Sequence, residues 1–176
     1  MPRKLLNSEL PRLTPQDYKE VTKAPLVLVL DNLRSQHNIG AAFRTADAFR
    51  IAKIYLCGIC AMPPSAEIHK AALGAEDTVD WYYEQDTVIA VKTLKQEGYT
   101  IVAVEQAENS MPLQEFKPEP NKKYALIFGN EVKGVQQQVV DACDIVLEIP
   151  QWGTKHSLNV SVSIGVILWD IVAKLR

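Results

Sequence analysis

Three segments of the chain combine glycine with side chains that can bind or orient other groups. The polar and charged members, in chain order, are Asn38, Arg44, Glu131, Ser157 and Asn159. Amides, hydroxyls and carboxylates position a substrate through hydrogen bonds, and a guanidinium binds phosphate in a bidentate manner. Simpler roles are open to some of them, because Asn38 and Ser157 could cap helices and glycines could form the turns around Glu131. These roles account less well for three segments of similar composition, so we treat the five residues as candidate site residues.

The glycines do not match the common nucleotide-binding fingerprints. A dinucleotide fold places G-x-G-x-x-G directly after its first strand, and that pattern is absent here. The segment from Gly129 to Gly134 follows a late strand and lacks the Lys-Ser/Thr ending of a phosphate-binding loop. The sequence therefore favours neither a nicotinamide dehydrogenase nor a nucleoside triphosphatase.

The elements around these segments alternate between strand and helix. Apolar runs predict strands over residues 26–30, 54–56, 79–83, 99–104, 124–128 and 145–149. Helical spacing and capping residues predict helices over 38–50, 65–72, 86–98, 135–142 and 158–175, and 106–123 is predicted as a polar loop. Such alternation predicts an α/β fold with a mostly parallel sheet and helices on both faces. All three segments follow strands, where ligands of such sheets bind.

The composition is that of one globular domain with an N-terminal extension. We expect a single domain over residues 25–176 and a charged extension over 1–24 that could contact RNA. The net charge of −2 argues mildly against a nucleic-acid partner, although a local basic face would suffice. The sequence has neither a secretory signal nor a membrane-length apolar stretch, so we expect a cytoplasmic protein without a membrane partner.

Cys57 and Cys60 form a C-x-x-C at the end of a predicted strand. A redox site of this spacing begins a helix, and a zinc site needs further ligands that are not apparent. We therefore expect buried structural thiols and no metal site.

The three segments resemble the motifs of the SpoU/TrmH family of SPOUT methyltransferases. Residues 38–44 match Asn-x-Gly-x-x-x-Arg, and residues 126–134 match an apolar strand followed by Gly-x-Glu-x-x-Gly. Residues 149–153 match Ile-Pro-x-x-Gly, and residues 157–161 read Ser-Leu-Asn-Val-Ser. The motifs occur in the family's order, and the resemblance extends from Leu26 to the C-terminus.

The resemblance implies an α/β domain with a deep C-terminal trefoil knot, which departs from the usual rule against threaded loops. It also implies a homodimer that binds S-adenosylmethionine. The predicted cofactor contacts are the backbone at Gly129, Ile149 and Leu158, with the strand end at Val104 beside the adenine. The apolar final helix is the candidate dimer interface.

The activity implied is transfer of a methyl group to a ribose 2′-hydroxyl of RNA, with tRNA preferred over rRNA. Arg44 would clamp the target phosphate, since a guanidinium is a poor base. Asn38 would hold the loop or the ribose, Glu131 would bind loop amides or a basic side chain, and Ser157 and Asn159 would position Arg44 and the substrate. Many relatives have methionine where this chain has Gln151, which is followed by Trp152.

Three alternatives stay open at this point. A knotted methyltransferase could act on a base, or a knotted RNA-binding module could have weak or no catalysis. A redox protein could use Cys57 and Cys60, in which case Cys57→Ser would abolish its activity.

Overall fold

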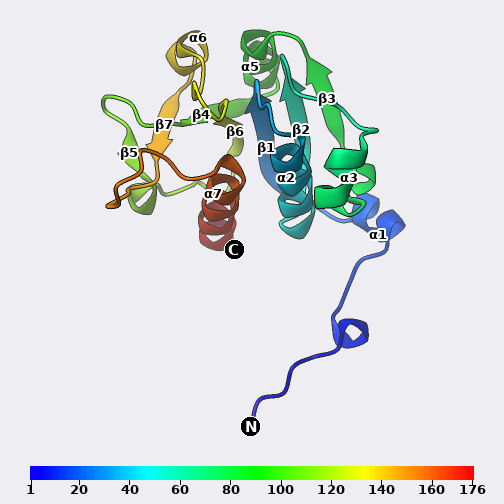
Figure 1. Ribbon diagram of the computed structural model, residues 1–176. Helices are drawn as coiled ribbons and strands as arrows, with labels where there is room; N and C mark the ends of the chain where they lie inside the picture. Colours follow the sequence, from blue (N-terminus) through cyan, green and yellow to red (C-terminus); the bar gives the residue numbers. More distant parts are fainter.

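The computed structural model describes residues 1–176 as an α/β fold around one seven-stranded sheet (Figure 1). The strands are β1 (Ala24–Asp31), β2 (Ile51–Cys57), β3 (Trp81–Glu84), β4 (Tyr99–Val104), β5 (Met111–Pro112), β6 (Lys123–Phe128) and β7 (Ile145–Glu148). Their order across the sheet is β3-β2-β1-β6-β4-β7-β5, and every pair is parallel. The prediction of a mostly parallel α/β sheet is confirmed.

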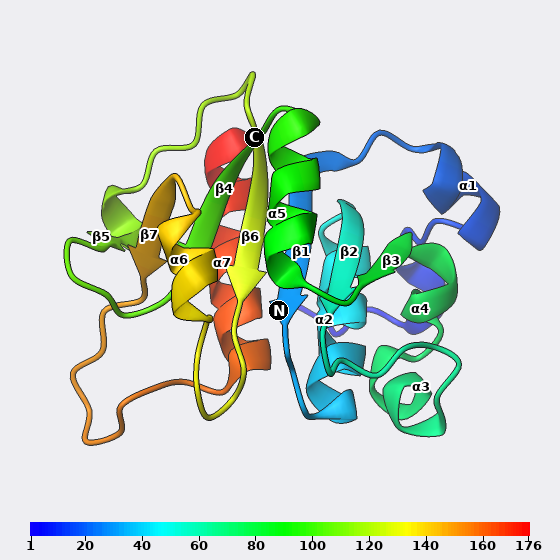
Figure 2. The same ribbon diagram turned by 90° about the horizontal axis from the view of Figure 1, so that it is seen from above.

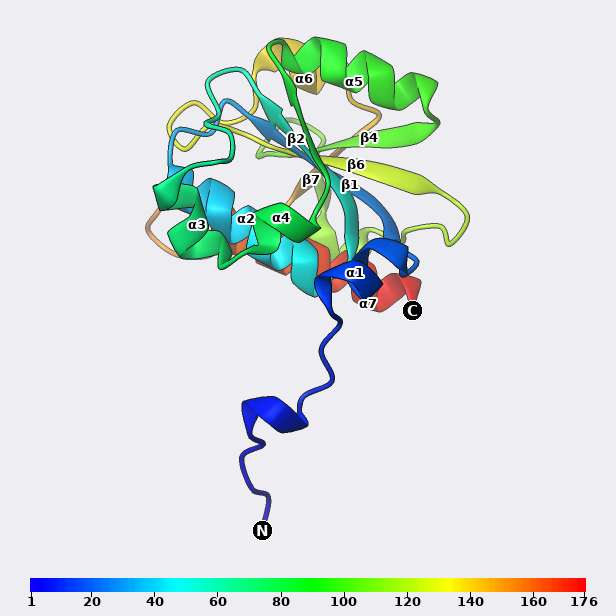
Figure 3. The ribbon, with the colours of Figure 1, turned by 90° about the vertical axis from the view of Figure 1, so that its right-hand side faces the viewer.

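Helices cover both faces of the sheet, as predicted (Figure 3). One face carries α1 (Pro15–Glu20), α2 (Gln36–Ala48), α3 (Ala66–Ala72), α4 (Ala75–Thr78) and α7 (Val160–Leu175), and the other carries α5 (Thr87–Gln96) and α6 (Gln137–Asp141). Strand β1 shows why both layers are needed. Leu26, Leu28 and Leu30 belong to the larger hydrophobic core, whereas Val27 and Val29 belong to the smaller one. A strand buried on both faces reads as a continuous apolar run.

Residues 106–123 differ from the predicted loop, because they include β5 and a 3-10 turn at Leu113–Glu115. Met111 and Pro112 pair with β7 at the edge of the sheet, and Leu113 and Phe116 are buried in the larger core. A two-residue edge strand that contains proline leaves no periodic signal.

The N-terminal residues extend away from the body, and the chain joins it at α1 (Figures 1 and 3). Tyr18 of α1 is buried in the larger core. An RNA-contacting role for residues 1–24 stays a prediction, as does the trefoil knot. None of the helices combines the length and the apolar character needed to cross a bilayer.

The two cysteines of the C-x-x-C are free and buried, as expected for structural thiols. The Cys60 thiol donates to the Leu30 carbonyl at 3.3 Å and accepts from the Leu33 amide at 3.2 Å. Burial raises the pKa of Cys57 to about 12 and that of Cys60 to about 11, so neither forms the reactive thiolate at neutral pH.

Replacing Cys57 with alanine is therefore expected to leave activity per folded molecule within about twofold of wild type, with some loss of thermal stability. The check is methyl transfer normalised to the folded fraction. Abolished activity in a folded Cys57→Ala protein would instead support the redox alternative.

Candidate active site

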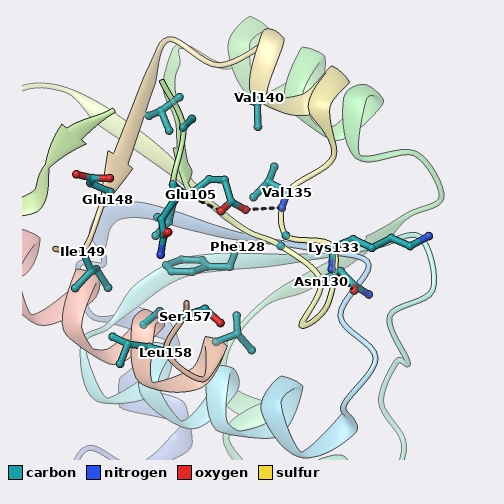
Figure 4. Close-up of a pocket in the computed structure, with 18 of the residues that line it drawn as sticks. Glu105, Phe128, Asn130, Lys133, Val135, Val140, Glu148, Ile149, Ser157 and Leu158 are labelled. Atoms are coloured by element: carbon teal, nitrogen blue, oxygen red, sulfur yellow. Dashed lines mark hydrogen bonds between the residues drawn. The ribbon is translucent and has the colours of Figure 1, made fainter. Parts of the chain in front are cut away.

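A large cleft lies at the carboxyl edge of the sheet, where the segments after β4, β6 and β7 meet. Figure 2 shows the loops after β1, β6 and β7 leaving toward the same edge. The pocket there has a volume of about 1080 Å³, and Figure 4 shows several of its lining residues. All four predicted cofactor residues line it, namely Val104, Gly129, Ile149 and Leu158. Glu131, Ser157 and Asn159 line it as well, whereas Asn38 and Arg44 do not.

The loop after β6 is a tight turn that two glycines make possible. Asn130 and Gly134 exchange backbone hydrogen bonds of 3.0 and 2.9 Å across it. A Cβ on Gly129 would lie 2.1 Å from the backbone carbonyl carbon of Gly134 and 2.1 Å from the amide nitrogen of Val135. Gly134 itself has a backbone φ of +68°, which residues other than glycine rarely adopt. Glycine at both positions therefore brings bare backbone to the pocket wall.

Glu131 joins the loop after β6 to the loop after β1. Its carboxylate accepts hydrogen bonds from the amides of Arg34 at 2.9 Å and Ser35 at 3.0 Å, and from the Asn38 side chain at 3.1 Å. Partial burial raises the pKa of Glu131, but these donors outweigh it and hold the pKa below its ordinary value. The carboxylate is thus charged at neutral pH and binds loop amides, one of the two roles predicted for it.

Asn38 extends this network to the third motif. Its side-chain oxygen accepts a hydrogen bond of 3.3 Å from the Asn159 side chain. Ser35 caps α2 and Asn159 caps α7, so capping explains neither Asn38 nor Ser157. Residues from three distant parts of the sequence are therefore joined beside the pocket through Glu131, Asn38 and Asn159.

Replacing Glu131 with glutamine is expected to reduce methyl transfer about tenfold or more, because an amide cannot accept from all three donors. Folding lowers the pKa of Glu131. The charged carboxylate therefore stabilises the folded state at any pH above the ordinary carboxyl pKa, and this stabilisation is lost as the pH falls through the lowered pKa of the folded protein. The difference in free energy of unfolding between wild type and Glu131→Gln should be largest near pH 7 and shrink below about pH 4. Denaturant titrations at both pH values check this, and a constant difference would contradict it.

Arg44 lies apart from this network. It is exposed on α2 and does not line the pocket of its own chain. Six residues of helix separate it from Asn38, which turns the two side chains to different faces of α2. The structure thus brings together the predicted residues of the second and third motifs with Asn38, but not with Arg44.

Sequence reasoning missed two residues that brace the pocket, Glu105 and Gln106. The Glu105 carboxylate accepts hydrogen bonds from the Val135 amide at 2.9 Å (Figure 4) and from the Gln106 amide at 2.8 Å. The Gln106 side chain donates to the His156 carbonyl at 2.6 Å. These contacts link the segment after β4 to the loops after β6 and β7. The available signal was the polar pair that directly follows the predicted strand over residues 99–104.

Asp31 is a third missed residue, which ties the sheet to the start of α6. It is fully buried at the end of β1. Its carboxylate accepts from the Thr87 hydroxyl at 2.6 Å and from the amide and side chain of Gln136 at 2.9 and 2.7 Å. A charged residue ending an otherwise apolar run was its signal in the sequence.

Replacing Gln106 with alanine is expected to weaken cofactor binding about three- to tenfold, which is the effect of losing one hydrogen bond that orders a pocket loop. Calorimetric titration measures this, with Gln137→Ala as the control because Gln137 is an exposed glutamine that also lines the pocket. Equal cofactor affinities in the wild type and both variants would show that the contact with His156 does not order the pocket.

Carboxylates dominate the charge of the pocket. They belong to Glu105, Glu108, Glu131, Asp141 and Glu148, whereas Lys133 is the one lysine or arginine in the lining. Apolar walls are supplied by residues such as Phe128 and Leu158. The pocket therefore suits a ligand that combines an apolar part, a positive charge and several hydrogen-bond donors.

Comparison with known proteins gives the context for this geometry. The SpoU rRNA Methylase family matches residues 25–169. The 23S rRNA (guanosine-2'-O-)-methyltransferase RlmB of Nitrosomonas europaea is 34% identical over 152 residues, which cover 85% of this chain and 56% of that protein. A putative TrmH family tRNA/rRNA methyltransferase of Staphylococcus saprophyticus is 30% identical over 89% of this chain and 61% of its own length. The chain thus spans little more than half the length of these curated relatives.

Solved structures agree with the fold. The A. aeolicus TrmH/SpoU tRNA modifying enzyme has a TM-score of 0.78 at 28% identity, over 91% of this chain and 79% of that one. An AdoMet-bound rRNA methyltransferase from Sinorhizobium meliloti has a TM-score of 0.77 at 25% identity, over 90% of this chain and 60% of that one. With the three motifs joined at one pocket and the family match covering most of the chain, this protein belongs to the SpoU rRNA methylase family.

Proposed function

We propose that this protein transfers the methyl group of S-adenosylmethionine to a ribose 2′-hydroxyl of RNA. The observation that carries the proposal is the single pocket at which Gly129, Glu131 and Asn159 meet, with Asn38 hydrogen-bonded to the last two. Relatives named as guanosine-2'-O-methyltransferases support the ribose as the acceptor.

The pocket fits this cofactor chemically. Backbone at Gly129 and the strand end at Val104 offer amides and carbonyls that can read an adenine edge, and the carboxylates suit a sulfonium and an ammonium group. A side chain on Gly129 would collide with the backbone of Gly134 and Val135, so only glycine allows the turn that forms this wall. When bound, S-adenosylmethionine supplies an already activated methyl group, so positioning by the protein should provide much of the rate.

In this proposal the chain's own residues either hold the motif loops or bind the substrate. Glu131, Asn38 and Asn159 hold the three motif loops in register. Arg44 binds the phosphate beside the target ribose and orients the hydroxyl. The hydroxyl proton passes to a phosphate oxygen or to water as the oxygen attacks, because a guanidinium is a poor proton acceptor.

In this proposal the protein is a homodimer, and Arg44 of one copy acts at the pocket of the other copy. Helix α7 presents exposed apolar side chains at Val162, Val166 and Trp169, and Trp169 packs against Phe49 beyond the end of α2 with ring centroids 6.2 Å apart. A row of exposed apolar side chains along one helix is typical of a subunit interface. Because Arg44 is exposed on α2 and lies outside the pocket of its own chain, we assign it to the pocket of a second copy docked on this face.

We propose RNA as the substrate without choosing between tRNA and rRNA. The RlmB relatives are named for 23S rRNA and give no support to the preference for tRNA, while the A. aeolicus structure is named as a tRNA modifying enzyme. The test of the ribose assignment offers both classes, each as unmodified RNA and as RNA with blocked 2′-hydroxyls. Transfer that requires free 2′-hydroxyls supports the proposal. Transfer that persists on blocked RNA would assign the activity to a base, and binding without transfer would indicate a module without catalysis.

A further inference from the structure

Trp152 is a large aromatic side chain that the folded chain leaves in solvent. It is 91% exposed, whereas Trp81 is half-buried and Trp169 packs against Phe49. A single exposed apolar residue is ordinary on a protein surface. The position of Trp152 beside the pocket is what makes it informative.

Trp152 belongs to residues 150–158, which form most of the segment between β7 and α7 and precede Asn159, the residue bonded to Asn38. Gln151, His156, Ser157 and Leu158 of this segment line the pocket, and Trp152 stands outside the lining. The bond from Gln106 to the His156 carbonyl is the one hydrogen bond that joins 150–158 to a distant part of the chain. The indole is therefore carried at the pocket rim on a segment with few constraints, which can adjust to a bound partner.

Two exposed lysines lie in the segments that form or border the pocket. Lys155 is exposed three residues after Trp152. In the loop after β6, which lines the same pocket, exposed Lys133 follows Val132, which is 76% exposed. Two segments at the pocket thus each combine an exposed apolar side chain with a lysine. Proteins bind single-stranded nucleic acid with aromatic rings that stack on bases and with nearby basic groups that contact phosphates.

We propose that Trp152 is a stacking platform for a nucleobase of the substrate RNA, with Lys155 and Lys133 binding adjacent phosphates. The inference rests on the proposed RNA methyl transfer and names a recognition residue for it. Stacking on an indole is tolerant of base identity, so Trp152 holds an unstacked nucleotide near the pocket without selecting its sequence. A second copy of the chain is the competing occupant of this surface.

The test compares wild type with Trp152→Ala and Trp152→Phe. Loss of stacking is expected to raise the apparent KM for unfractionated tRNA or fragmented rRNA about tenfold, while phenylalanine restores most of the affinity. The dissociation constant for S-adenosylmethionine and the oligomeric state should stay at their wild-type values. An unchanged KM in Trp152→Ala, a KM that phenylalanine does not restore, a weaker dimer, or an equal loss of cofactor affinity would each overturn the inference.

A binding experiment separates this inference from the proposed activity. RNA should quench the tryptophan fluorescence of wild type, and Trp152→Ala should lose that quenching whether or not methyl transfer occurs. Quenching that Trp152→Ala retains would place the RNA elsewhere, even if the methyltransferase activity is present.

Discussion

Replacing Arg44 with alanine is expected to reduce methyl transfer by about 100-fold or more while the dissociation constant for S-adenosylmethionine stays within about twofold of wild type. Arg44 lies outside the cofactor pocket, so its loss removes a substrate contact rather than a cofactor contact. Single-turnover transfer and calorimetric titration measure the two quantities separately. Arg44→Lys is the matched control, because it keeps the charge but not the bidentate geometry, and it should recover only a minor part of the rate. Loss of cofactor affinity in Arg44→Ala would show that the assignment of Arg44 to the RNA side is wrong.

The same variant tests whether Arg44 acts across a dimer. Arg44→Ala keeps an intact pocket, and Gly129→Ala keeps an intact Arg44. Random mixing of the two inactive chains makes half of the dimers mixed, and one of the two sites in each mixed dimer is complete if Arg44 acts on its partner's pocket. Co-expression should then restore about a quarter of the wild-type activity. No restoration from a folded mixed dimer would place Arg44 at the pocket of its own chain.

Replacing Gly129 with alanine is expected to abolish cofactor binding at concentrations that saturate the wild type. The added methyl would lie 2.1 Å from backbone atoms of Gly134 and Val135, and backbone cannot move aside as a flexible side chain can. The turn must therefore open, at a loss of about 1–3 kcal/mol in the free energy of unfolding. Calorimetric titration and denaturant unfolding measure the two effects.

Gly153→Ala is the matched control for this substitution. Gly153 lies in the segment after β7, and a Cβ there would have no neighbour within 4 Å. Its replacement should leave both cofactor affinity and stability within about twofold and 0.5 kcal/mol of wild type. If Gly129→Ala binds cofactor as well as Gly153→Ala does, the close approach at Gly129 does not shape the cofactor site.

The central strands and the helices with polar caps could be predicted from the sequence. A continuous apolar run marks β1 because it is buried on both faces. Ser65 and Asp86 cap α3 and α5 through their side chains, as their positions before helical patterns indicated. These features depend on local sequence, so they could be predicted from this one sequence.

Features that depend on distant contacts could not be predicted in this way. Helix α6 begins at Gln137 rather than 135, and the amides of Val135 and Gln136 before it bind the distant carboxylates of Glu105 and Asp31. Helix α7 begins at Val160 rather than 158, because Asn159 serves as its cap. For the site, the motifs selected candidate residues, most of which line one pocket. Their spacing could not show that Asn38 binds Glu131 and Asn159, or that Arg44 lies outside the lining of its own pocket.

The most direct test of the account is transfer of tritiated methyl from S-adenosylmethionine to RNA from cells that lack this protein. Small RNA and ribosomal RNA are offered separately, and the labelled nucleotides are identified after digestion. The account predicts label in a 2′-O-methylnucleotide of one RNA class, with none when Gly129→Ala replaces the wild type. Label confined to bases, or no label from wild-type protein that binds the cofactor, would contradict it.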